Sequence, residues 1–191
     1  MAKSYDLLND QHIEFIRKQK LFFVATAPLS PEGSVNLSPK GYDSIAILDS
    51  HTVAWVDLGG SGIETLAHLR ENSRITLMFC AFEGAANILR IYGRGEAISF
   101  DNAEFSGLMK LFPAFDRARS IIRIRIDRVS DSCGWGVPFF EFKEEREQLQ
   151  RWVDNRPYDE WKEHRYKRNE KSVDGLPGLV RPSLGSEGGA S

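Results

Sequence analysis

The segment DLGGSGIETLAHLREN, residues 57–72, determines how the rest of the chain is interpreted. The apolar run 52–56 before it predicts a strand, which stops at the glycine loop Gly59-Gly60-Ser61-Gly62. From Ile63 the apolar residues recur at helical spacing, so a helix follows the loop. The first turn of a helix leaves backbone N–H groups unpaired, and its dipole favours negative charge. The segment therefore has the form of an anion-binding turn, although the same pattern also serves as a plain tight connection.

Composition narrows the class of protein. The chain has 191 residues, of which 41% are hydrophobic, which is enough for one domain with a real core. A net charge of −2 and a pI near 6.1 argue against nucleic acid or an anionic membrane as the main partner. We find neither a signal-peptide pattern nor an apolar run near the roughly 20 residues that span a bilayer. Two cysteines give no metal-site spacing. We therefore expect a cytoplasmic protein with no metal.

Short apolar or alternating runs indicate a mainly β fold. The run SIIRIRIDRV, residues 120–129, alternates isoleucines with charged residues, which is typical of a half-exposed strand. Arg123 and Arg125 are expected in salt links on the exposed face, with a partner subunit or an anionic ligand as the alternatives. Including this run, about seven strands are predicted, joined mostly by short turns: 21–27, 35–38, 45–48, 52–56, 74–82, 88–98 and 120–129. Few helices separate them, so the pattern favours an antiparallel barrel or sandwich over a doubly wound parallel sheet.

Helical patterns lie at both ends of the chain and beside the strands. Asp10 is the predicted cap of a first helix, and Asp101 with Glu104 forms a capping-box pattern for another. Two charged helices, 143–155 and 158–170, follow the strands, and Trp161 and Arg165 are predicted to face inward in the second. We expect a barrel over 1–142, a helical extension packed on it over 143–180 and a disordered tail over 181–191.

Three motifs in order carry a resemblance to a known family: NLSPKGYD at 36–43, WVDLGGSGIETLAHLRENSRITLMF at 55–79 and ILRIYGRGEAI at 88–98. This arrangement, over roughly residues 11–138, resembles the pyridoxamine 5'-phosphate oxidase-like family of FMN-binding split barrels. The resemblance implies an antiparallel split β-barrel with flanking helices. It also implies a homodimer with FMN in each of two clefts at the subunit interface.

The resemblance also implies cofactor-binding residues. In that family a basic residue closing an early strand, and polar residues at the start of the following helix, hold the FMN phosphate. Those positions here are Lys40, with Asn36 and Ser38 before it, and Ser61, Gly62 and Thr65. Oxidases of the family place an arginine or lysine at the helix start, where this chain has Glu64-Thr65. A further basic donor is therefore expected, and Arg90 and Arg74 are the candidates.

The substrate side departs from the family pattern. True pyridoxamine-phosphate oxidases end on a basic strand motif with arginine and histidine, whereas this chain has SDSCGWGVPFFEF at 130–142. We therefore expect an FMN-dependent oxidoreductase acting on a small organic substrate other than a B6 vitamer, with a non-catalytic flavin or haem binder as the alternative. Trp135 has two open interpretations, stacking on the flavin or plugging a barrel end.

The remaining candidates have structural interpretations as well. Glu64 and His68 are four residues apart, which predicts a surface helix pair more readily than a metal site. His164 is predicted on a solvated helix face, although a C-terminal histidine binds haem in some split-barrel relatives. Cys80 is predicted in the core, and Cys133 is a candidate accessible thiol. The turn-rich arm SVDGLPGL, residues 172–179, is expected to pack on another surface, with the dimer mate as the candidate.

Overall fold

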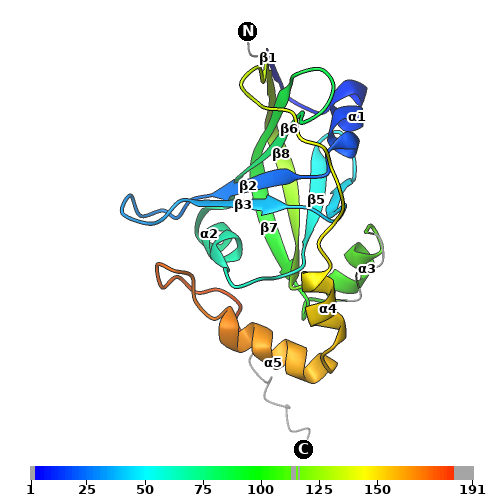
Figure 1. Ribbon diagram of the computed structural model, residues 1–191. Coiled ribbons are helices and arrows are strands. Elements are labelled where there is room, and N and C mark those ends of the chain that lie inside the picture. Colours follow the sequence, from blue (N-terminus) through cyan, green and yellow to red (C-terminus); the bar gives the residue numbers. More distant parts are fainter. Residues whose placement is uncertain (1–2, 113–114, 116, 183–191) are drawn as a thin grey trace, which may run out of the picture.

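The computed structural model describes residues 3–112, 115 and 117–182. Within these residues eight strands form one antiparallel sheet that curls into a split barrel (Figure 1). They are β1 (Lys3–Tyr5), β2 (Phe22–Thr26), β3 (Asn36–Lys40), β4 (Ile45–Ile47), β5 (Thr52–Asp57), β6 (Arg74–Cys80), β7 (Ile88–Ser99) and β8 (Ser120–Ser132). Their order is β3-β2-β6-β7-β8-β5-β4, and β1 pairs with β8. The predicted antiparallel split barrel is confirmed, and β1 joins the seven predicted strands.

Strand β8 is the central element of the sheet. Its isoleucines Ile122 and Ile124 are fully buried, and its arginines lie on the open face as the alternation predicts. Arg123 contacts Glu96 at 2.8 Å and Glu104 at 3.0 Å, which confirms the predicted salt links. The long β7–β8 ladder has a register shift between Tyr92 and Gly93. A side chain at Gly93 would lie 2.3 Å from the Arg125 carbonyl oxygen, so the close approach there requires glycine.

The pairing of β2 with β3 decides which way the polar residues of β3 face. Phe22 pairs with Lys40, Val24 with Ser38 and Thr26 with Asn36. Directly paired residues of an antiparallel ladder project from the same face of a sheet. Phe22, Val24 and Thr26 are buried in the barrel. Asn36, Ser38 and Lys40 therefore form a polar stripe on the inner face of an edge strand.

The core fills the curl of the sheet. Phe22 stacks on Phe79, with ring centroids 5.4 Å apart, and both side chains are buried. Cys80 is also buried, as predicted, and Cys133 is exposed. The largest cluster draws on every long strand of the sheet; its fully enclosed members include Val24, Val53, Leu77, Phe79, Leu89, Ile91, Ile122, Ile124 and Val129. The inner face of the sheet is therefore apolar except along the polar stripe of β3 and at the end of β5.

Five helices flank the sheet in the part of the chain that the structure describes: α1 (Asp10–Lys18), α2 (Glu64–Asn72), α3 (Phe105–Met109), α4 (Gln148–Asp154) and α5 (Tyr158–Arg168). None of them is long and apolar enough to cross a membrane. The N-cap of α1 is Asn9, whose side chain accepts from the His12 N–H, so the prediction of Asp10 was wrong by one residue.

Two further helix predictions are corrected. The Asp101 capping box is wrong because the Asp101 carboxylate accepts hydrogen bonds from Ser99 and Tyr166 instead of from the backbone of α3. The helix predicted from residue 143 begins at Gln148. Glu147 is the N-cap of this helix, and its carboxylate contacts the Arg151 guanidinium four residues later. The residues 143–147 are charged and have no apolar face to pack, so the sequence pattern does not show where the helix begins.

The C-terminal segment packs on the glycine loop and α2. In Figure 1, α5 lies below α2, and the arm after it returns toward the β2–β3 hairpin. Trp161 and Tyr166 of α5 pack on Phe100. Leu179 of the arm is buried against Ile63 and Leu66 of the same chain, so this contact of the arm is intramolecular. The predicted tail falls largely on 183–191, outside the described residues.

Candidate functional site

The glycine loop between β5 and α2 is the centre of the site. Gly59 has φ of +92°, in the region that favours glycine. A Cβ at Gly59 would also lie 2.5 Å from the Arg165 Cζ. Ile63 is the N-cap of α2 and supplies no side-chain hydrogen bond, while Ser61 and Gly62 are exposed. The loop therefore needs glycine both for its turn and for the close approach of α5.

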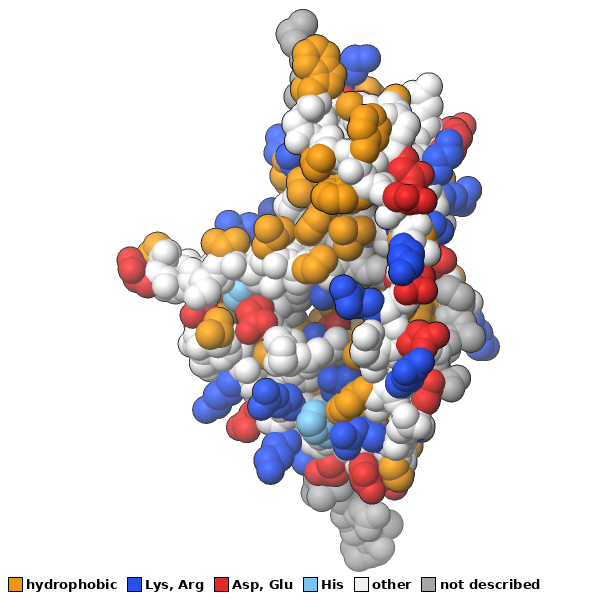
Figure 2. Space-filling view, viewed as in Figure 1, with side chains coloured by type: hydrophobic (Ala, Val, Ile, Leu, Met, Phe, Trp, Pro, Cys, Tyr) orange, Lys and Arg blue, Asp and Glu red, His pale blue; other side chains and the backbone are white. Residues whose placement is uncertain are grey.

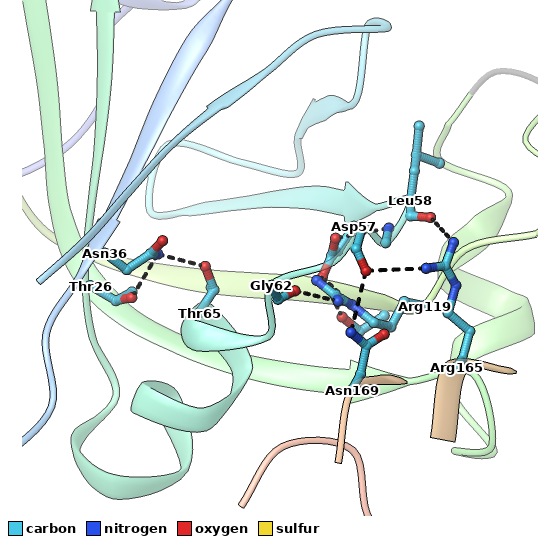
Figure 3. Close-up of polar contacts among 12 residues, drawn as sticks. Thr26, Asn36, Asp57, Leu58, Gly62, Thr65, Arg119, Arg165 and Asn169 are labelled. Atoms are coloured by element: carbon cyan, nitrogen blue, oxygen red, sulfur yellow. Dashed lines mark hydrogen bonds and ion pairs between the residues drawn. The ribbon is translucent and has the colours of Figure 1, made fainter. Parts of the chain in front are cut away.

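A buried ion pair anchors the loop to the barrel. Arg119, immediately before β8, donates to Asp57 Oδ2 through Nε at 2.9 Å and Nη2 at 2.6 Å, and both side chains are about 95% buried or more. The Nη1 group of Arg119 donates to the Gly62 carbonyl at 2.6 Å (Figure 3). Burial alone raises the pKa of the Asp57 carboxyl, but the Arg119 and Lys40 cations outweigh it and hold the pKa below its ordinary value.

Helix α5 holds the loop from the other side. Arg165 donates to the Gly60 carbonyl at 3.3 Å and to the Leu58 carbonyl at 3.4 Å, and Asn169 donates to the Gly60 carbonyl at 3.3 Å. The Arg165 guanidinium also lies 4.7 Å from the centroid of the Trp152 ring. Burial, followed by the nearby Arg119 cation, lowers the pKa of Arg165 to about 10. Two C-terminal residues thus donate hydrogen bonds to the backbone of the loop.

Lys40 brings a third cation to this end of the barrel. Its Nζ lies 5.0 Å from the centroid of the Trp55 ring, and within the described residues it has no hydrogen bond or ion pair. Burial lowers the pKa of Lys40, the Asp57 carboxylate raises it and Arg119 lowers it. The hydroxyl of Ser38, two residues earlier on the same face, is buried with no partner among the described residues. Three cations therefore surround one carboxylate, which favours an added anion.

A neutral polar cluster lies at the other end of the β3 stripe (Figure 3). The Asn36 amide donates to Thr26 Oγ1 at 3.1 Å and to Thr65 Oγ1 at 3.0 Å. Thr26 Oγ1 also lies 3.0 Å from His68 Nδ1, so the cluster reaches the buried histidine of α2. Thr65 accepts from Asn36, which leaves the Thr65 hydroxyl proton free to donate to a ligand.

His68 is fully buried, which overturns the predicted surface pair with Glu64. The face of α2 that carries His68 packs against β2. The spacing of residues in the helix does not show which face meets the sheet, so the prediction of a surface position was wrong. Glu64 instead accepts a hydrogen bond from the Val173 N–H of the arm at 3.2 Å. Among the described residues no group of three or more potential metal ligands is found.

Acidification is expected to destabilise the protein through His68. Burial lowers the pKa of His68, and nearby carboxylates only partly oppose this. Below the unfolded-state pKa, about 6.5, His68 is protonated in the unfolded chain and still neutral in the folded chain. The unfolded state therefore binds more protons, and the free energy of unfolding falls as pH falls. The expected slope from this residue approaches about 1.4 kcal/mol per pH unit at most. Denaturant unfolding at pH 7.5 and 5.5 measures it, and a His68→Gln variant that retains the full slope would contradict this assignment.

The structure brings together only some of the predicted site residues. Asn36 and Thr65 are in contact, but Lys40 lies four residues along β3 from Asn36, roughly 13 Å away at about 3.3 Å per residue. Arg90 donates to Ser132, and Arg74 contacts Asn72 and the Pro28 carbonyl, so neither takes part in the loop contacts. Trp135 is 86% exposed, which removes its interpretation as a barrel plug.

Sequence reasoning missed three of the groups that hold the loop, namely Arg119, Asp57 and Asn169. Arg119 carried no recognisable signal beyond its position just before a buried strand, because an ion pair between residues 62 positions apart depends on the fold. Asp57 lay within the decisive segment and was given no role. Arg165 was predicted to face inward, and it does, but its contact with the loop carbonyls was not predicted.

Comparisons with known proteins agree with this fold. Residues 8–133 match the family model described as pyridoxamine 5'-phosphate oxidase. The chain is 36% identical over 192 residues to the pyridoxamine 5'-phosphate oxidase family protein ustO of Aspergillus flavus, covering 92% of this chain and 77% of that protein.

Two solved structures share the fold. A histidine-to-alanine variant of HupZ from Group A Streptococcus has a TM-score of 0.53 and 20% identity over 65% of this chain and 98% of that one. A Lactobacillus delbrueckii protein described provisionally as a pyridoxamine 5'-phosphate oxidase has a TM-score of 0.50 and 14% identity over 65% and 94%.

The fold and the site therefore define an antiparallel split barrel with a polar inner stripe on β3 and a glycine loop held by buried cations. The family match and the relative from Aspergillus flavus place it more closely: the chain belongs to the pyridoxamine 5'-phosphate oxidase family.

Proposed function

We propose that the protein is an FMN-binding flavoprotein that acts as an oxidoreductase on a small organic substrate. The single observation that carries the proposal is the contact between Asn36 and Thr65, which places a free hydroxyl donor beside the glycine loop and the start of α2. A helix N-terminus with such donors suits a phosphate, which carries about −1.5 to −2 charge at neutral pH. Membership of the family supports FMN as the phosphate-bearing ligand.

The inner stripe of β3 suits the rest of the cofactor. Ser38 and Lys40 continue from Asn36 toward Trp55, and both present unpaired polar groups in the described part of the chain. In the space-filling view, basic side chains surround a hollow between β3 and the C-terminal helices (Figure 2). We propose that the phosphate lies at the α2 end, with Ser61, Gly62 and Thr65, and that Lys40 faces the other end of the flavin.

The bound flavin would supply the two-electron chemistry, and the protein would supply orientation and charge. Lys40, with Asp57 and Arg119 behind it, places net positive charge at the far end of the stripe. Such charge favours a cofactor that becomes more negative on reduction. Arg90 lies on the outer face of the sheet, and we propose no phosphate contact for it within one subunit.

The outer surface supports a homodimer with the cofactor near the interface. Hydrophobic side chains gather over the upper part of the face seen in Figure 2. The exposed large ones on β3 and in the segment after β8 include Leu37, Trp135, Phe139, Phe140 and Phe142. Exposed apolar side chains in such number are typical of an interface. Sedimentation equilibrium measures the state, and a monomer that binds FMN fully would contradict the interfacial cleft.

A visible spectrum of the full chain tests the proposed function. After titration with FMN, a bound flavin is expected near one per chain. The same protein is titrated with haem, because a non-catalytic haem binder is the alternative that the fold allows. Uptake of haem without uptake of FMN would overturn the proposal. Screening of reductants and acceptors on the flavin-loaded protein then tests the oxidoreductase part.

Removal of the Thr65 hydroxyl is expected to weaken FMN binding. A Thr65→Val variant loses one hydrogen bond to the charged phosphate, so affinity should fall by about 1.5–3 kcal/mol, with riboflavin affinity unchanged. Fluorescence titration with both flavins measures the difference. Equal losses for FMN and riboflavin would place the phosphate elsewhere.

Trp135 provides a separate test of the exposed surface. Because its side chain is 86% exposed, Trp135→Ala should change the free energy of unfolding of the isolated chain by no more than about 0.5 kcal/mol. A fall in flavin affinity or in dimerisation would support its stacking or interface role. A large loss of stability at a protein concentration where the chain is monomeric would contradict the exposed placement.

A further inference from the structure

The glycine loop is held by its carbonyl groups. Arg165 and Asn169 of α5 donate to the carbonyls of Leu58 and Gly60, and Arg119 donates to the carbonyl of Gly62. Three carbonyls at alternate positions therefore face the same buried group of cations, in which Arg119 and Arg165 are close enough to affect each other electrostatically.

This arrangement fixes the direction of the neighbouring N–H groups. In a trans peptide the C=O of one residue and the N–H of the next lie in one plane and point in opposite directions. The Gly59 N–H shows the rule at work, since it points away from the Leu58 carbonyl and donates to Asp57 Oδ1 at 3.0 Å. The N–H groups of Ser61 and Ile63 must likewise point away from Arg165 and Arg119.

Both N–H groups border the exposed part of the loop. Ser61 and Gly62 are exposed, and within the described residues the Ser61 and Ile63 N–H groups have no protein acceptor. In Figure 3, Thr65 and Asn36 lie on one side of Gly62, while Arg119, Arg165 and Asn169 lie on the other. The two N–H groups and the Thr65 hydroxyl are thus three donors for which the described part of the protein supplies no acceptor.

We propose that Arg165 and Asn169 are positioning residues of the phosphate site, through which α5 orients the loop so that the Ser61 and Ile63 N–H groups receive the anion. The proposal rests on the proposed function for the identity of the ligand, but its geometry applies to any phosphate. It gives the C-terminal extension a part in cofactor binding that is exerted through the loop, although α5 lies outside the region 8–133 that matches the family model.

The burial of Arg165 supports this role. Its side chain is 98% buried, its Nε has no partner in the described part of the chain, and it stacks on Trp152. A buried cation with incomplete hydrogen bonding is costly, and an anion across the loop reduces that cost. Lysine cannot replace it, because an ammonium lacks the planar fork that reaches two carbonyls at once.

The test uses the full chain with two substitutions at Arg165 and one matched control. Arg165→Met removes both hydrogen bonds from Arg165 to the loop carbonyls, and Arg165→Lys keeps the positive charge without the planar guanidinium. Arg156→Met is the control, because Arg156 lies 4.6 Å from the centroid of the same Trp152 ring and its side chain does not contact the loop. Denaturant unfolding verifies that each variant is folded, and affinities for FMN and riboflavin are measured by fluorescence.

We expect Arg165→Met and Arg165→Lys to bind FMN about tenfold more weakly or worse, with riboflavin affinity unchanged and Arg156→Met like the wild type. Wild-type FMN affinity in folded Arg165→Met, or full rescue by lysine, would overturn the positioning role. If Arg165→Met does not fold, Asn169→Ala replaces it, with a smaller loss expected.

A second measurement separates this inference from the proposed function. Amide NMR signals of the wild type are followed during titration with inorganic phosphate. Shifts at Ser61 and Ile63 that disappear in the Arg165 variants, but persist in Arg156→Met, support the inference even if FMN does not bind. A wild type whose Ser61 and Ile63 signals respond to neither phosphate nor FMN would overturn it. Failure to bind FMN alone overturns only the proposed function.

Discussion

Asp57→Ala is expected to lower the free energy of unfolding by about 3–5 kcal/mol, because it leaves the Arg119 guanidinium buried without its carboxylate. The pair is joined by two hydrogen bonds of 2.9 and 2.6 Å and is almost fully enclosed. Lys40 and Arg165 would lose the same counter-charge, since both interact with Asp57. Denaturant unfolding of the variant near pH 7 measures the loss.

An exposed pair on the same sheet is the matched control. Asp127 lies 3.1 Å from Arg94 and 3.4 Å from Arg125, and the exposed fractions of the three side chains are 36%, 51% and 72%. Solvent screens such a pair, so Asp127→Ala should cost no more than about 1 kcal/mol. Equal losses in the two variants would show that burial of the Asp57 pair does not govern its contribution to stability.

Lys40→Met is expected to weaken flavin binding by about 1.5–3 kcal/mol, the usual range for a hydrogen bond to a charged group. The ammonium has no ion pair within the described residues and rests on the Trp55 ring, so it is available to a ligand. Because Lys40 lies roughly 13 Å along β3 from Asn36, we expect FMN and riboflavin affinities to fall together. Fluorescence titration with both flavins gives the two values.

The two flavin affinities of Lys40→Met also show which part of the cofactor Lys40 contacts. If Lys40→Met loses affinity for FMN alone, Lys40 contacts the phosphate, as the family resemblance predicts, and the flavin lies in the opposite direction along β3. If neither affinity changes, Lys40 is not a cofactor-binding residue. Lys20→Met is a suitable control for loss of positive charge, because Lys20 Nζ lies 5.8 Å from the centroid of the Phe142 ring and is not part of the stripe.

The fold could be predicted from the sequence because its signals are local. The alternation in 120–129 and the apolar runs of β2, β5 and β6 each identify a strand without knowledge of its neighbours. Caps were less predictable, since Asn9 and Asp10 are equally good N-cap residues and only the backbone geometry selects Asn9.

The candidate site was only partly predictable. Asn36 and Thr65 were grouped correctly because the family motifs contain both positions, although their contact depends on the pairing of β2 with β3. His68 was assigned to the surface because helical spacing does not show which face of α2 meets the sheet. The groups that hold the loop, Arg119 and Arg165, come from distant segments, and such contacts leave no pattern in one sequence.

Calorimetric titration of the full chain with FMN, beside an identical titration with riboflavin, tests the central claim most directly. The phosphate site at the start of α2 predicts sub-micromolar binding of FMN and clearly weaker binding of riboflavin, because only FMN reaches the Ser61 and Ile63 N–H groups and the Thr65 hydroxyl. Equal affinities for the two flavins, or binding of neither, would contradict the assignment of this loop as a phosphate site.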